Sequence, residues 1–202
     1  MDRTFTEVLA SRRMCRDFEA TTLASGTAES LVDAATRAPA AGNTHALDFV
    51  VLEGPQTSLY WDTTLAQHRR DGFRWPGLLR APMLLVAYVE PGAYVRRYSE
   101  PDKAHSGLGD DPGDWAVPYW YVDGGAAVMA VLLAAETLGL GSLLFGQFGH
   151  EQAVADALGV PQGHRSVGTI AVGRRAVGER SRSKSAGRGR PVVGEILHRG
   201  RW

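Results

Sequence analysis

The segment Ser11-Arg12-Arg13-Met14-Cys15-Arg16-Asp17-Phe18 places three arginines directly after a stretch with helical periodicity. A second segment, Ala186-Gly187-Arg188-Gly189-Arg190-Pro191, places two more arginines among small residues near the end of the chain. Fixed cations with little bulk around them suit a phosphate group, because the backbone can then approach the anion. Either cluster alone is more commonly solvated surface charge, so its meaning depends on the sequence between the two.

Two further segments between the arginine clusters bring the number of motifs along the chain to four. The first is Ala38-Pro39-Ala40-Ala41-Gly42-Asn43-Thr44-His45-Ala46-Leu47-Asp48-Phe49-Val50-Val51, and the second is Leu138-Gly139-Leu140-Gly141-Ser142-Leu143-Leu144-Phe145-Gly146. In order and spacing, the four segments resemble the FMN-dependent nitroreductase family over roughly residues 4–200. The resemblance implies an α+β nitroreductase-like fold, with a central mixed or antiparallel sheet flanked by helices. It also implies an intertwined homodimer in which FMN lies at the subunit interface and contacts both chains.

The same resemblance implies how the arginines would hold FMN. Arg12, Arg188 and Arg190 would bind its phosphate, and Arg13 is an added candidate for that role. Arg16 matches a basic position that reaches the ribityl chain or the ring edge. A phosphate and a polar chain are the parts of FMN that guanidinium groups recognise best.

The middle segments would contact the flavin ring. Small residues beside Asn43 let a ring approach the backbone, and amides near Gly146 would face the N5 side of the ring. Asn43 could also be an ordinary turn residue, and Gly146 could end an ordinary buried strand. Met14 replaces the family's usual serine, which leaves only backbone contacts there, and His45-Ala46-Leu47 replaces Gln-Pro-Trp. The residues implied to bind the cofactor are Arg12, Arg13, Met14, Arg16, Pro39, Ala40, Ala41, Asn43, Leu143, Leu144, Phe145, Gly146, Arg188 and Arg190.

The composition is that of a globular protein without a dominant charge. Of the 202 residues 44% are hydrophobic, and 22 basic residues balance 22 acidic ones. This balance argues against nucleic acid as the main partner, and no apolar run is long enough to span a bilayer. The single cysteine, Cys15, excludes an intramolecular disulfide and favours a reducing compartment. We therefore expect a soluble cytoplasmic protein, without a metal site because the six histidines lack ligand spacing.

A length of 202 residues, with no clear second domain in the sequence, predicts one domain over residues 1–202. Asp123 is expected to cap a long helix that is apolar almost all round and therefore buried. Residues 91–118 show no sustained period, so we expect a structureless lid or substrate loop there, or a disordered insertion. The tail 191–202 contains apolar residues, so we expect it to pack on a surface that buries them. In the resembled family that surface belongs to the partner subunit. Helices are expected at residues 4–12, 28–38, 55–70, 123–138 and 151–158, and strands at 49–52, 83–89, 142–145 and 166–172.

The resemblance implies a ping-pong oxidoreductase. NADH or NADPH would reduce FMN and leave, and a small planar acceptor, nitroaromatic or quinone-like, would then be reduced in the same pocket. Neither nucleotide is favoured by the sequence, and no side chain is assigned a catalytic role. Because His45-Ala46-Leu47 and the segment 91–118 depart from the family pattern, a specialised flavin oxidase or dehydrogenase of a biosynthetic intermediate is an alternative. A non-catalytic FMN-binding protein is another, since binding and catalytic motifs coincide.

Overall fold

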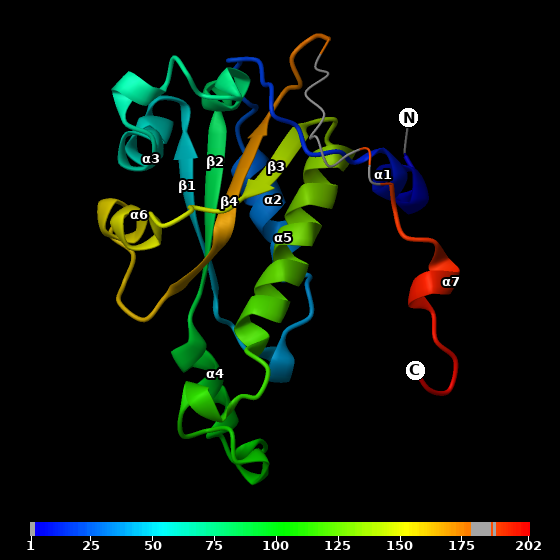
Figure 1. Ribbon diagram of the computed structural model, residues 1–202. Coiled ribbons are helices and arrows are strands. Elements are labelled where there is room, and N and C mark those ends of the chain that lie inside the picture. The colour runs from blue at the N-terminus through cyan, green and yellow to red at the C-terminus, as the bar shows by residue number, and fades with distance from the viewer. Residues whose placement is uncertain (1–2, 179–186, 188) are drawn as a thin grey trace.

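The computed structural model describes residues 3–178, 187 and 189–202, which fold around one four-stranded sheet (Figure 1). The strands run in the order β1-β2-β4-β3, and every neighbouring pair is antiparallel. The expected α+β class is confirmed, and each predicted strand lies within an observed one. The strands are β1 (Leu47–Glu53), β2 (Met83–Val89), β3 (Gly141–Phe145) and β4 (Arg165–Gly173).

The central strand β2 separates the two halves of the hydrophobic core. All seven of its residues are buried, because a strand with helices over both faces of its sheet has no solvent side. Leu84 and Val86 pack into the core on one face, whereas Met83 and Leu85 pack into the core on the other. This alternation follows from the two-residue period of a strand.

Helices cover both faces of the sheet (Figure 1). Helices α2 and α5 bury Leu31 and Val131 against one face, while α3 and α6 bury Tyr60 and Val154 against the other. In the described part of the chain, no helix has the length and apolar character needed to cross a membrane. The helices are α1 (Phe5–Ser11), α2 (Thr27–Thr36), α3 (Thr57–Thr64), α4 (Pro91–Tyr98), α5 (Tyr119–Thr137), α6 (Glu151–Ala157) and α7 (Val193–Ile196).

Asp123 does not cap α5, contrary to the prediction from the sequence. The helix begins at Tyr119, directly after Pro118, so Asp123 lies in its second turn. Proline has a fixed φ that suits the entry to a helix, which explains the earlier start. The Asp123 carboxylate instead accepts a hydrogen bond from the backbone of another segment.

Residues 91–118 are not structureless, which corrects the expectation for this segment. They begin with α4, and the Tyr94 ring meets the Trp115 ring edge-on with centroids 5.6 Å apart. Both rings are buried, together with Trp120 from the start of α5. The aromatic side chains thus give the segment a small core of its own. Its helix has only eight residues, which is too short for a periodic pattern to reveal.

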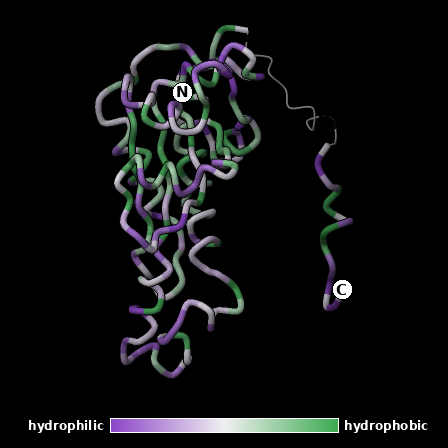
Figure 2. Tube along the Cα trace, turned by 60° about the vertical axis from the view of Figure 1, so that its left-hand side comes forward, coloured by the Kyte–Doolittle hydropathy of each residue, from purple (hydrophilic) through white to green (hydrophobic). Residues whose placement is uncertain are grey.

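Apolar side chains remain exposed on α1, on one side of α5 and on the C-terminal tail. In α1 only Val8 is buried. The prediction that the long helix is buried almost all round is wrong, because Tyr121 and Val122 of α5 are exposed. Figure 2 shows the tail apart from the body of the domain, with hydrophobic positions along it. The exposed apolar residues of these three elements include Phe5, Leu9, Tyr121, Val122, Val192, Val193, Ile196 and Leu197.

Candidate functional site

The N-terminal arginine segment and the β3 segment lie side by side. Thr4 caps the start of α1, and the helix ends just before the arginines. The chain then passes β3, where Met14 forms a β-bridge with Ser142. The Cys15 N–H donates to the Ser142 carbonyl at 2.9 Å. Two motifs that are far apart in the sequence are therefore adjacent in space.

Arg12 carries a guanidinium group that is partly shut off from water. Its Nε and Nη1 atoms are buried and have no hydrogen-bond partner among the described residues. A buried cationic donor without a partner costs free energy, which a bound anion would recover. The environment of Arg12 therefore fits the phosphate-binding role predicted for it.

Arg13 points back to the end of α1. Its Nη1 donates to the carbonyl of Ala10 at 2.6 Å and to the carbonyl of Arg12 at 2.8 Å. The last carbonyls of a helix have no partner within the helix, so basic side chains often satisfy them. In this structure the Arg13 guanidinium therefore binds carbonyls at the C-terminal end of α1. A phosphate-binding role for Arg13 stays a prediction.

Glu136 ties α1 to the end of α5. Its side chain is buried and accepts hydrogen bonds from Ser11 at 2.7 Å, from Arg3 at 3.3 Å and from Arg175 at 2.6 Å. Burial alone would raise the pKa of Glu136, but the Ser11 hydrogen bond and the charges of Arg175 and Arg3 outweigh it and lower that pKa. This cluster fixes the helix end from which Arg12 emerges.

A cavity of about 540 Å³ opens beside β3. We call it the β3 cavity. Six of its thirteen lining residues are aromatic. The Trp61 and Phe145 rings are nearly parallel with centroids 5.9 Å apart, and the Phe73 and Trp75 rings meet edge-on. Flat apolar walls of this kind suit a planar ring. The predicted site residues that line it are Arg16, Leu143, Leu144, Phe145 and Gly146.

Arg16 stands at one wall of the β3 cavity with its cation over an aromatic ring. Its guanidinium carbon lies 5.6 Å from the centre of the Trp75 ring, and that of Arg74 lies 4.9 Å from it. Such cation–π contacts hold a guanidinium in a defined orientation. Arg16 is therefore placed to reach the edge of a ligand in the β3 cavity.

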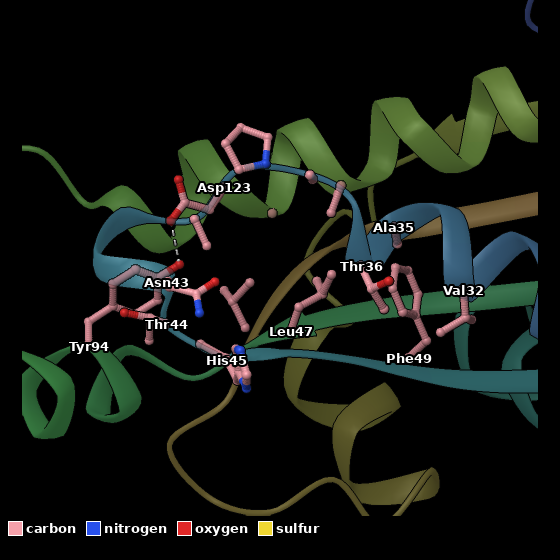
Figure 3. A pocket seen from close by; sticks show the side chains of 17 residues that line it. Val32, Ala35, Thr36, Asn43, Thr44, His45, Leu47, Phe49, Tyr94 and Asp123 are labelled. Carbon is pink, nitrogen blue, oxygen red and sulfur yellow. Dashed lines mark hydrogen bonds between the residues drawn. The ribbon is translucent and has the colours of Figure 1, made fainter.

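A second cavity, of about 260 Å³, lies between α2, β1 and α5 (Figure 3). We call it the Asn43 cavity. Figure 3 shows the Asn43 side chain between Tyr94 and Leu47. Oδ2 of Asp123 accepts hydrogen bonds from the Ala41 N–H at 2.7 Å and from the Tyr94 hydroxyl at 2.8 Å. The predicted site residues that line this cavity are Pro39, Ala40 and Asn43.

The two cavities have no lining residue in common. Eight of the fourteen predicted residues thus line two separate cavities of one chain, five beside β3 and three beside Asn43, whereas Arg12, Arg13, Met14 and Ala41 line neither. Arg190 is exposed on the segment before α7, and Arg188 lies outside the described residues. Five aromatic residues that line the β3 cavity were missed from the sequence: Tyr60, Trp61, Phe73, Trp75 and Phe148. Only the clustering of aromatic residues around them could have indicated a site.

Cys15 is fully buried, and its thiol donates to the Asp17 carbonyl at 3.1 Å. A substrate therefore cannot reach it without rearrangement of the core. Over residues 3–178, 187 and 189–202, no cluster of histidine, cysteine, aspartate and glutamate could hold a metal ion.

Known proteins share this architecture. A nitroreductase family protein from Clostridium novyi NT has a TM-score of 0.66 and 24% identity over 87% of each chain. An FMN complex from Exiguobacterium sibiricum 255-15, which carries a nitroreductase name, has a TM-score of 0.73 and 16% identity over 97% of each chain. A protein from Clostridium acetobutylicum named as an NADH oxidase has a TM-score of 0.64 and 18% identity over 96% of this chain and 99% of its own.

Sequence comparison gives the family directly. No curated protein sequence matches the chain significantly. The model of the Nitroreductase family, in contrast, matches residues 9–174, which include the N-terminal arginines and the walls of both cavities. The chain therefore belongs to the nitroreductase family.

Proposed function

We propose that this chain is an FMN-dependent oxidoreductase that passes reducing equivalents from NADH or NADPH to a small planar acceptor, nitroaromatic or quinone-like. The observation that carries the proposal is the Arg12 guanidinium, whose Nε and Nη1 atoms are buried and have no hydrogen-bond partner among the described residues. Membership of the nitroreductase family and the FMN complex of one structural neighbour support it.

The residues present fit FMN in several respects. Arg12 would bind the phosphate together with Arg188 and Arg190 of the C-terminal segment. Arg16 would meet the polar edge of the cofactor, and the aromatic walls of the β3 cavity would exclude water from its ring. The backbone beside Gly146 would donate hydrogen bonds to the ring, as would Met14 through its backbone. When bound, FMN would supply the hydride chemistry through its N5 atom, so no side chain needs to act as an acid or base.

A homodimer would complete the site. Because the β3 cavity and the Asn43 cavity are separate on one chain, we propose that each FMN uses the first from one subunit and the second from its partner. The exposed apolar residues on α1 and α5 offer a surface for that contact. We also propose that the single domain ends in a tail, residues 191–202, that lies on the partner.

Removal of residues 192–202 is expected to weaken the dimer. Val192, Val193, Ile196 and Leu197 are at least half exposed on the isolated chain, so burial against a partner would stabilise the assembly. Sedimentation velocity at falling protein concentration would show the shortened chain dissociating first. A Val177→Ala variant, which removes an exposed valine outside the tail, serves as control. An unchanged dissociation profile for the shortened chain would count against tail exchange.

A flavin-dependent oxidase is a second candidate. His45 lines the Asn43 cavity where the family pattern has glutamine, and one structural neighbour is named as an NADH oxidase. Steady-state consumption of NADH and NADPH, measured with a quinone under nitrogen and then in air without it, separates the candidates. We expect quinone-dependent turnover under nitrogen. Consumption only in air would favour an oxidase that uses NADH or NADPH. Binding of FMN without consumption of either nucleotide would favour an oxidase or dehydrogenase of another substrate, or a non-catalytic flavin protein.

A further inference from the structure

The turn that carries Asn43 has an unusual backbone. Gly42 and Asn43 both have positive φ, at +64° and +54°. Asparagine tolerates the left-handed conformation better than most residues with a Cβ, so the sequence Gly42-Asn43 suits this turn. Because the Asn43 side chain leaves from this turn, whatever holds the turn also sets the direction of the Asn43 amide.

One support comes from α5. Oδ2 of Asp123 accepts the Ala41 N–H at 2.7 Å and the Tyr94 hydroxyl at 2.8 Å. Figure 3 shows the second of these hydrogen bonds. Tyr94 is buried, and burial together with the Asp123 carboxylate raises its pKa, so its hydroxyl remains a donor. Asp123 therefore links the start of the turn to both α5 and α4.

A second support comes from the end of α4. The Arg97 Nε donates to the Gly42 carbonyl at 2.8 Å. The rest of its guanidinium is paired with Asp102 at 2.7 and 2.8 Å and with Glu100 at 3.0 Å, which fixes its orientation. Tyr98 covers Gly42 so closely that a Cβ there would lie 2.7 Å from the Tyr98 ring. The turn is thus held through an N–H, a carbonyl and a steric contact.

We infer that α4 and the residues after it form a buttress for the Asn43 turn, with Arg97 and Asp123 as positioning residues. This inference rests on the proposed function, in which Asn43 completes the flavin site of the partner subunit. The segment 91–118 then contributes to the site by fixing one of its walls. Two charged side chains that bind two neighbouring peptide groups of one turn, at the Ala41 N–H and at the Gly42 carbonyl, are suited to that task.

Amide exchange in the FMN-free protein tests the buttress without reference to activity. We expect the backbone amides of residues 41–44 to exchange about tenfold faster in Arg97→Gln and in Asp123→Ala, because each variant loses a charge-assisted hydrogen bond to the turn. Arg96→Gln is the matched control: Arg96 lies beside Arg97 on α4 but pairs with Glu90 at 2.8 Å. Equal exchange in Arg97→Gln, Asp123→Ala and Arg96→Gln would overturn the inference.

FMN affinity gives the second readout. We expect Arg97→Gln to raise the Kd for FMN about tenfold relative to Arg96→Gln while the two apo-proteins unfold at similar temperatures. Asp123→Asn keeps an oxygen acceptor for the Ala41 N–H and should restore most of the affinity lost in Asp123→Ala. An unchanged Kd in Arg97→Gln would overturn the positioning role. If the wild-type chain bound no FMN, the proposed function would fail, while the exchange experiment would still decide whether the buttress exists.

Discussion

Replacing Arg12 and Arg190 together by alanine is expected to give a folded, colourless protein. Each charge-assisted hydrogen bond to a phosphate contributes about 1.5–3 kcal/mol, so the double variant should bind FMN at least about a hundredfold more weakly. The two buried nitrogens of Arg12 have no partner among the described residues. Its removal should therefore leave the apo-protein as stable as the wild type, or more stable, because an unpaired buried donor is lost.

Two measurements check this result. Flavin content after purification and the FMN Kd report the binding step, and thermal unfolding of the apo-protein reports the fold. Arg37→Ala is the control, since Arg37 is an exposed arginine that pairs only weakly with Asp33 on α2. Retention of FMN at normal stoichiometry in the double variant would remove the phosphate assignment.

Replacing Glu136 by alanine is expected to lower the free energy of unfolding by about 2–4 kcal/mol. Removal of one member of a buried ion pair costs about 3–5 kcal/mol, and the lower figure allows for the partial exposure of Arg3 and Arg175. The Glu136 side chain is only 9% exposed, whereas those arginines are about a third exposed. Because Glu136 also binds Ser11 at the end of α1, FMN affinity should fall with stability.

Chemical denaturation of matched variants tests the role of Glu136. Asp33→Ala, which removes a carboxylate that is 66% exposed, should change stability by no more than about 0.5 kcal/mol. The pKa of Glu136 is lowered from 4.5 in the folded protein, so its contribution is complete above that value and is lost as the pH falls through the folded pKa. The difference in stability between the wild type and Glu136→Gln should therefore shrink on acidification. A difference independent of pH would contradict the role assigned to the charge.

Regular, locally encoded elements could be predicted from the sequence. The apolar run of β2 predicted a buried strand with the observed bounds, since both of its faces are covered. The long helix predicted to end near residue 138 ends at Thr137, and Gly139 follows it with a φ of +73°, which glycine adopts without strain. The resemblance also predicted the class of fold, which rests on four motifs spread along the whole chain.

Features that depend on contacts between distant segments could not be predicted. Aspartate is a common helix-capping residue, but the Asp123 carboxylate accepts a hydrogen bond from the Ala41 N–H, which is 82 positions away in the sequence. The order in 91–118 depends on Tyr94 and Trp115 meeting in a small core. Likewise, the aromatic walls of the β3 cavity follow no motif, because α3 and the segment around Trp75 reach it from separate parts of the chain.

The most direct test of the account is a visible absorption spectrum of the purified protein, repeated without oxygen after addition of NADPH and then of NADH. We predict flavin bands at one FMN per chain that bleach rapidly with at least one of the two donors. Bands that persist with both donors would contradict the reductase assignment. Absence of flavin, together with failure to bind added FMN, would contradict the assignment of Arg12 and the β3 cavity as a flavin half-site.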